Sequence, residues 1–107
     1  MKCQVYILQD AEDDILGIYR YVSLHDSKEN AESLIDKIKE TCASLETFPD
    51  RGHTPPELDR VGVFSYKETH FKPYRILYEI VETAVYVHCV LDSRRSLQEL
   101  LEKRLLR

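Results

Sequence analysis

The chain has 107 residues, a length that suits a single domain over residues 1–107, and 43% of them are hydrophobic and 32% charged. No segment approaches the roughly 18 consecutive apolar residues of a membrane span, and residues 2–8 lack the apolar core of a signal peptide. We therefore expect a cytoplasmic protein without a membrane association.

Charge is distributed unevenly along the chain. Residues 1–60 hold 7 basic and 13 acidic side chains, a net −6, whereas residues 61–107 hold 8 and 6, a net +2. Such a division favours two surfaces that meet two kinds of partner. Cys3, Cys42 and Cys89 are odd in number, far apart and set in apolar patterns, which predicts buried reduced thiols. Closely paired ligands of the CxxC type are lacking, so we predict no metal site and no cofactor.

The first half of the chain predicts one strand and two helices. Residues 3–8 alternate between two faces and are rich in β-branched and aromatic side chains, as in a strand. We expect Asp10 to cap the helix that follows, and Asp26 with Glu29 has the form of a capping box for the next. Both helices carry apolar residues at helical spacing: Ala11, Ile15, Ile18, Tyr19 and Val22 in the first, and Ala31, Leu34, Ile35, Ile38, Cys42 and Leu45 in the second.

The second half predicts three strands and a closing helix. After an irregular loop through Pro55 and Pro56, one strand is expected over residues 61–68. Two strands in residues 74–92 are apolar on both faces, as in central strands covered on each side. In the last strand, simple alternation places one set of side chains on a common face: Val85, Val87, Cys89 and Leu91. Ser96 and Glu99 resemble a capping box for a helix whose apolar face is Leu97, Leu100, Leu101 and Leu105.

This order, β-α-α-β-β-β with a short C-terminal helix, predicts an α+β fold in which a helical hairpin packs on a small, mainly antiparallel sheet. Five motifs in this order carry a resemblance: DAEDDILGIYRYV, LETFPDRG, PPEL, YRILYEI and VLDSRR. Together they resemble the RelE/ParE superfamily of toxins from type II toxin–antitoxin modules, and most closely its ParE branch, also described as plasmid-stabilisation proteins.

The resemblance implies a cytoplasmic toxin that a cognate, ParD-like antitoxin neutralises by wrapping an amphipathic segment around it, in a toxin–antitoxin hetero-oligomer. ParE toxins inhibit DNA gyrase, whereas RelE toxins cut messenger RNA on the ribosome. In the ParE reading the target-binding residues are Arg75, Arg94 and Arg95, with no catalytic residue and no direct sequence-specific binding of nucleic acid. An alternative for Arg75 is an ion pair with Glu79. Asp92 and Ser93 replace the family's His-Gly pair, and Asp92 is placed to pair with Arg95.

Two alternatives remain open. A metal-independent RNase needs a base, an acid and cations around a phosphate, and Lys67, His70, Arg75 and Arg94 are the residues that would serve. The nuclease reading is weakened by the absence of Tyr and His from residue 93 onward and by the net charge of −4.

The other alternative is a non-toxic module that only binds an antitoxin, through a groove between the helices or through an edge strand, either the first or that over residues 61–68. In both this reading and the ParE reading, the antitoxin-binding residues are those of the hairpin: Ile15, Ile18, Tyr19, Val22, Leu34, Ile35 and Ile38.

Overall fold

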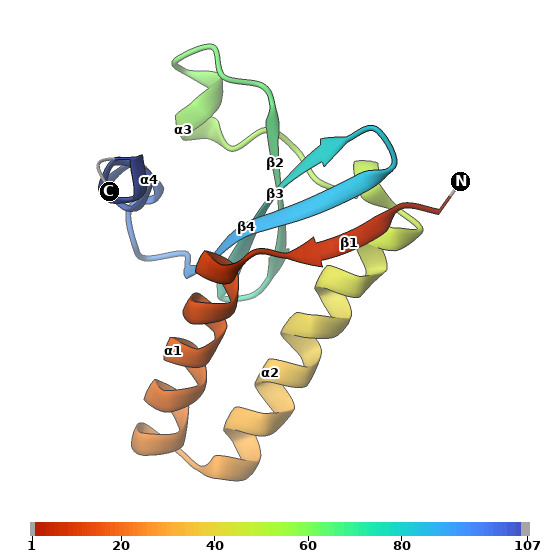
Figure 1. The fold of residues 1–107 in the computed structure, drawn as a ribbon. Coiled ribbons are helices and arrows are strands. Elements are labelled where there is room, and N and C mark those ends of the chain that lie inside the picture. The colour runs from red at the N-terminus through yellow and green to blue at the C-terminus, as the bar shows by residue number, and fades with distance from the viewer. Residues whose placement is uncertain (1, 106–107) are drawn as a thin grey trace.

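The computed structural model describes residues 2–105, in which a four-stranded sheet has helices on both faces (Figure 1). The strands are β1 (Gln4–Ile7), β2 (Tyr66–Phe71), β3 (Tyr74–Val81) and β4 (Ala84–Asp92). The helices are α1 (Gln9–His25), α2 (Lys28–Ala43), α3 (Pro56–Asp59) and α4 (Leu97–Leu105), with two 3-10 turns, η1 (Ser44–Glu46) and η2 (Pro49–Arg51). The predicted α+β class and order of elements are confirmed. The one added helix is α3, which begins at Pro56, where the fixed φ of proline suits a first helical position.

The strand order is β1-β4-β3-β2, in which β1 runs parallel to β4 and the other pairs are antiparallel. The edges are therefore β1 and β2, as expected for the first strand and the strand after the loop. The predicted bounds of that second edge strand, 61–68, are wrong. Residues 60–63 instead close a turn after α3, in which Gly62 has a φ of 75° and Leu58 O accepts the N–H groups of Val61 and Val63.

Two of the three predicted helix caps are displaced. The residue before α1 is Leu8, which provides no side-chain cap, so the prediction of Asp10 is wrong. In α2 the cap is Ser27, whose Oγ accepts from Asn30 N at 3.0 Å, while Asp26 binds the Asn30 side chain. Serine and aspartate cap helices about equally well, so a pattern with both leaves the boundary open by one residue. The predicted cap of α4 is confirmed, because Ser96 Oγ accepts from the backbone N–H of Glu99.

Two apolar clusters lie on opposite faces of the sheet. The larger lies under the α1–α2 hairpin and includes Ile15, Ile38, Ile76, Tyr78 and Val85, all nearly or fully buried. The smaller lies under α4 and α3 and contains Leu77, Cys89, Leu91, Leu97 and Leu100. Coverage of β3 and β4 on both faces is thus confirmed, and so is the burial of all three cysteines.

A β-bulge in β4 changes which side chains face the hairpin. The pairing with β3 steps from Leu77↔Cys89 to Tyr78↔Val87, which leaves His88 as the extra residue. Val87 and Val90 consequently face the hairpin, while Cys89 and Leu91 face α4. The predicted common face of Val85, Val87, Cys89 and Leu91 is therefore wrong beyond Val87, because uninterrupted alternation does not allow for an inserted residue.

Candidate functional site

The segment that leaves β4 presents two arginines to solvent. Ser93 N donates to Pro73 O at 2.8 Å and Arg95 N donates to Asp92 O at 2.9 Å, so a turn fixes the backbone where the strand ends. Arg94 and Arg95 are both exposed, and Leu97, the buried first residue of α4, anchors the far side of the turn. The short connection between β4 and α4 thus holds two cationic side chains at a defined place.

The two arginines differ in their partners. Arg94 donates from Nε and Nη2 to the two Asp92 carboxylate oxygens, at 3.0 and 2.7 Å. The Arg94 side chain and its backbone N–H lower the pKa of Asp92 to about 2, so this carboxylate stays ionised. The predicted pairing of Asp92 with Arg95 is wrong. Within residues 2–105, the Arg95 side chain has no hydrogen-bond or ion-pair partner, which leaves its guanidinium available.

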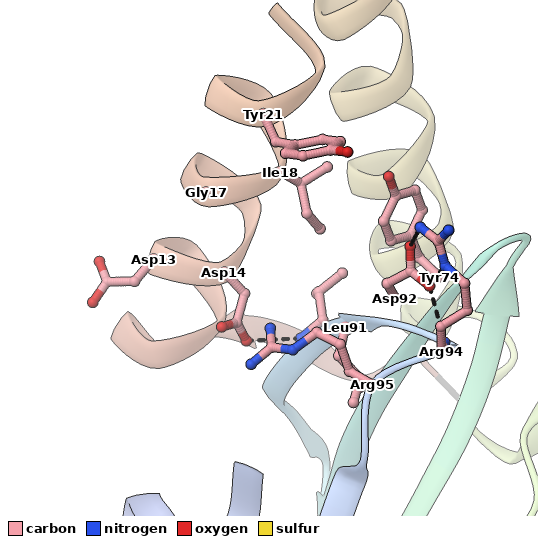
Figure 2. A pocket seen from close by; sticks show the side chains of 11 residues that line it. Asp13, Asp14, Gly17, Ile18, Tyr21, Tyr74, Leu91, Asp92, Arg94 and Arg95 are labelled. Carbon is pink, nitrogen blue, oxygen red and sulfur yellow. Dashed lines mark hydrogen bonds and ion pairs between the residues drawn. The ribbon is translucent and has the colours of Figure 1, made fainter. Parts of the chain in front are cut away.

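A pocket of about 620 Å³ opens between α1 and the end of β4, and both arginines line it (Figure 2). We call it the α1–β4 pocket. Its apolar part comes from Ile18, Tyr21 and Tyr74, and Gly17 leaves an open space on α1. In Figure 2, Arg95 points toward α1 and Arg94 turns back toward Asp92 and Tyr74. The pocket combines aromatic surface with cations, which suits an amphipathic protein segment that carries carboxylates.

Asp14 connects this pocket to the C-terminal helix. Its carboxylate accepts from Val90 N at 3.0 Å and pairs with Arg104 Nη2 at 2.5 Å, and Arg104 also donates to His88 O at 3.1 Å. Burial raises the pKa of Asp14, against the opposing effect of the Val90 N–H and Arg104. The acidic start of α1 therefore does more than complement the helix dipole, because Asp14 ties α1, β4 and α4 together.

Arg75 lies away from Arg94 and Arg95 and is engaged internally. It makes one fork of hydrogen bonds to Glu57, at 2.7 and 2.9 Å, and a second to Glu68, at 3.0 and 2.8 Å. The side chains of Arg75 and Glu68 are 11% and 3% exposed, and the pairing lowers the pKa of Glu57 to about 2. The predicted ion pair between Arg75 and Glu79 is wrong, because Glu79 instead contacts His88 Nε2 at 3.1 Å. Arg75 thus stabilises the fold and has little capacity left for a target.

The four residues of the nuclease alternative do not form one site. His70 and Glu68 project from β2 on the face that holds Arg75, whereas Lys67 points to the opposite face by strand alternation. His70 lies 2.8 Å from Glu68 Oε1 and Arg75 is bound to the same carboxylate, so Glu68 opposes the positive charge that would attract a phosphate. Arg94 belongs to the α1–β4 pocket.

Most side chains predicted to bind an antitoxin serve the core first. Ile15 and Ile38 are buried, and Ile18, Leu34 and Ile35 pack against the larger cluster. Tyr19 and Val22 are half-buried. The exposed apolar side chains of α1 are others: Leu16, Tyr21 and Leu24, with 45, 61 and 80% of their surface accessible. In the sequence, Tyr21 lies outside the set of apolar residues at helical spacing in this helix, which indicates a side chain that faces away from the core.

The thiols of Cys42 and Cys89 are unreactive as nucleophiles. Burial raises the pKa of Cys42 to about 11 and that of Cys89 to about 12, so neither is a thiolate near neutral pH.

Among the described residues, no helix is long and apolar enough to cross a bilayer.

Comparisons with known proteins agree with this fold. The model of the family "ParE toxin of type II toxin-antitoxin system, parDE" matches residues 5–97. A chain of the chromosomal ParDE system from P. aeruginosa superposes with a TM-score of 0.72 at 14% identity, over 85% of this chain and 96% of that one. A chain of the toxin–antitoxin complex RelBE2 from Mycobacterium tuberculosis gives 0.64 at 18% identity, over 86% and 99%. Comparison with curated protein sequences gives no match.

Proposed function

Because the chain belongs to the ParE toxin family of type II toxin–antitoxin systems, we propose that it inhibits DNA gyrase by binding, through the exposed surface around Arg94 and Arg95. Binding alone is sufficient for this role, so no proton-transfer groups are required. The observation that carries the proposal is the contrast between the two arginine sites: Arg95 has an available guanidinium at the end of β4, whereas Arg75 is bound to two carboxylates.

The arrangement of the remaining polar groups favours binding over RNA cleavage. Lys67 and Arg94 lie apart from His70 and Arg75, and Glu68 sits between the latter two. A phosphorane needs converging cations and an acid within hydrogen-bond reach. A guanidinium, in contrast, forms two parallel hydrogen bonds to a carboxylate or phosphate with no further group. The exposed pair therefore suits recognition of an anionic patch on a partner protein.

We further propose that the cognate antitoxin, a ParD-like protein, covers the exposed side of α1 beside the α1–β4 pocket. Tyr21 and Leu24 offer apolar surface there, and Tyr21 lines the pocket together with the half-buried Ile18. An amphipathic segment that buries these side chains gains apolar contact while its acidic groups lie near Arg94 and Arg95. Such a segment would block the gyrase surface directly, which explains neutralisation by simple competition.

The test is to add the purified full chain to two reactions in parallel. The first is gyrase supercoiling of relaxed plasmid, scored also for cleaved DNA, and the second is translation of a defined message on ribosomes. We expect supercoiling to fall and cleaved DNA to accumulate while the message stays intact. Cleavage of the message with supercoiling unchanged would establish the nuclease alternative, and no effect in either reaction would leave a module that only binds its antitoxin.

A further inference from the structure

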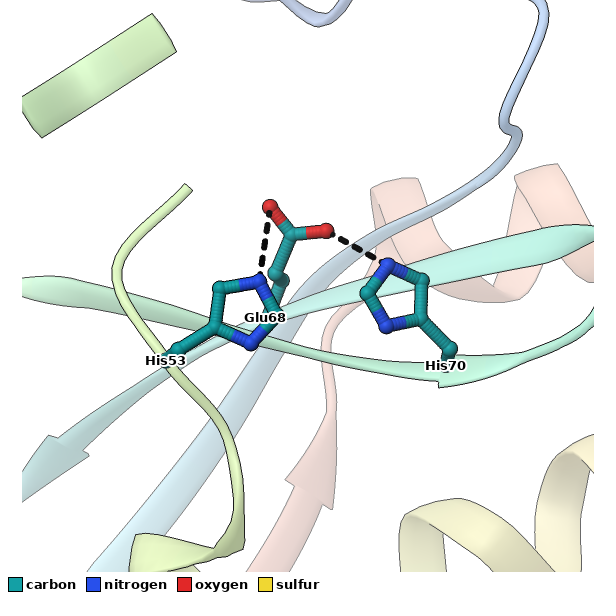
Figure 3. Close-up of side chains that lie close together, drawn as sticks. All are labelled: His53, Glu68 and His70. Carbon is teal, nitrogen blue, oxygen red and sulfur yellow. Dashed lines mark ion pairs between the residues drawn. The ribbon is translucent and has the colours of Figure 1, made fainter. Parts of the chain in front are cut away.

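Three side chains outside the proposed target surface converge at the edge of the sheet: His53, Glu68 and His70 (Figure 3). One ligand atom from each lies within 4.8 Å of the other two. His70 Nε2 is 2.8 Å from Glu68 Oε1, and His53 Nε2 is 3.9 Å from Glu68 Oε2. The carboxylate therefore lies between the two imidazoles, and one oxygen faces each ring.

The backbone holds these residues together independently of their charges. His53 N donates to Glu68 O at 3.0 Å and Glu68 N donates to His53 O at 2.7 Å, an isolated antiparallel bridge that joins the segment after η2 to β2. His70 follows Glu68 by two residues, so both point to the same face of β2. Ligands from two chain segments are thus brought to one place by main-chain pairing.

The separations are compatible with a metal ion after small movements of the rings. Zinc–nitrogen bonds of about 2.0–2.1 Å in a tetrahedron require ligand atoms about 3.3 Å apart. The His70 distance is somewhat shorter than this and the His53 distance somewhat longer. His53 and His70 are 58 and 41% exposed, so their rings can rotate without disturbing the core, whereas Glu68 is 3% exposed and fixed.

Arg75 provides the outer contact that a metal-binding carboxylate usually has. Its Nε and Nη2 donate to the two Glu68 oxygens at 3.0 and 2.8 Å, which sets the orientation of the carboxylate. An ionised carboxylate has about four acceptor positions, so each oxygen retains one for another partner. Glu57 holds the other edge of Arg75, and Arg60 lines the same pocket, so two carboxylates face two guanidinium groups around the histidines. The attraction of this site for a cation therefore depends on direct coordination by Glu68 and the two imidazoles, and not on an excess of negative charge.

We propose that His53, Glu68 and His70 bind one divalent transition-metal ion of the zinc class. Two imidazoles and one carboxylate favour such ions over Mg²⁺ and Ca²⁺, which prefer oxygen ligands alone. The fourth coordination position is open to solvent, since both rings are exposed. The bound ion would clip the segment containing His53 to the β2 edge and stabilise this part of the fold. The sequence predicted no metal site, because these three residues are not closely paired along the chain.

The experiment uses the full chain, freed of metal by a chelator and kept with a non-thiol reductant. Competition between the protein and a chromophoric chelator gives the Zn²⁺ affinity and stoichiometry, and Co²⁺ gives a visible spectrum that reports geometry and ligand type. We expect one Zn²⁺ per chain, an increase in Tm on binding, and Co²⁺ bands of nitrogen and oxygen ligation. His53→Ala and His70→Ala should each weaken binding by at least about 100-fold, the upper end of the loss for outer contacts alone.

His25→Ala is the matched control, because His25 is an exposed histidine on α1 that contacts only local groups there; we expect its affinity to equal that of the unmodified chain. Three results would overturn the proposal: binding too weak to be stoichiometric, equal affinity in the His53→Ala/His70→Ala double variant, or a thiolate-to-cobalt charge-transfer band that identifies cysteine ligands. In the first case the two histidines serve only as ion-pair partners of Glu68.

Discussion

Replacing Arg75 tests whether this arginine is structural or contacts the target. In Arg75→Met the methylene stem is approximately kept, but both forks of hydrogen bonds, to Glu57 and to Glu68, are lost. Glu68 is then a carboxylate with 3% of its side chain exposed whose remaining partners are two histidines. Most of the expected loss of stability comes from leaving the Glu68 charge buried without its main counterion. The loss of the attraction between the two groups contributes less.

The expected magnitude follows from that burial. Breaking a buried ion pair by removal of one partner costs about 3–5 kcal/mol, against a total stability of roughly 5–15 kcal/mol for a domain of ordinary size. Arg75→Lys keeps the charge without the planar fork, and Glu57 and Glu68 then compete for a single ammonium group. We expect its loss of stability to fall between zero and that of Arg75→Met.

The same network has a pH signature. Hydrogen bonding to Arg75 lowers the pKa of Glu57 to about 2. Since the pKa in the folded state lies below the unfolded value of roughly 4.3, this group contributes stability that is present above that value and is lost as the pH falls toward 2. In Arg75→Met the Glu57 contribution disappears, so the difference in stability between the two proteins should narrow as the pH falls.

The assay is urea unfolding followed by far-UV circular dichroism, because the chain has no tryptophan. A cycle with Glu68→Gln isolates the pair, and we expect the double variant to be more stable than the sum of the two single losses implies. A free energy of unfolding for Arg75→Met within about 1 kcal/mol of that of the unmodified chain would be well below the cost of a broken buried pair. The structural role of Arg75 would then be wrong. Loss of toxicity with stability unchanged would assign Arg75 to the target surface.

Two other side chains give separate tests. Tyr78→Phe removes a buried hydroxyl that donates to Pro49 O at 2.6 Å and accepts from Gly52 N at 3.0 Å; leaving these groups unsatisfied should cost about 1–3 kcal/mol in urea unfolding, and a smaller loss would mean that water replaces the hydroxyl. Leu24→Asp changes a side chain that is 80% exposed, so Tm should stay constant while the affinity for the antitoxin falls in a titration. Unchanged affinity would move the antitoxin contact off this part of α1.

The sequence predicted the features that depend on local pattern. Helical spacing located the hairpin, two apolar faces identified β3 and β4 as central strands, and the capping pattern at Ser96 located the start of α4. The exposure of Arg94 and Arg95 follows from the same logic, because a buried strand has to end before a capped helix begins.

What the sequence did not predict depends on tertiary registration. The partners of Arg75 come from α3 and from the neighbouring strand, 18 and 7 residues away, so no spacing rule selects Glu57 and Glu68 over Glu79. The bulge at His88 reverses the faces of the last residues of β4 without a marker such as glycine. The meeting of His53 with Glu68 requires a backbone bridge between a loop and an edge strand.

The most direct test of the central claim is the affinity of purified gyrase for the chain and for its Arg94→Ala/Arg95→Ala variant, measured together with supercoiling inhibition. Arg20→Ala/Arg60→Ala removes two other exposed arginines and is the control for charge alone. For the first variant we predict that the affinity for gyrase falls by at least about 30-fold, the equivalent of roughly 2 kcal/mol for an interfacial charge pair, while its far-UV circular dichroism spectrum is unchanged. The control variant should bind gyrase with nearly the affinity of the unmodified chain. Equal affinity of all three proteins would contradict the account.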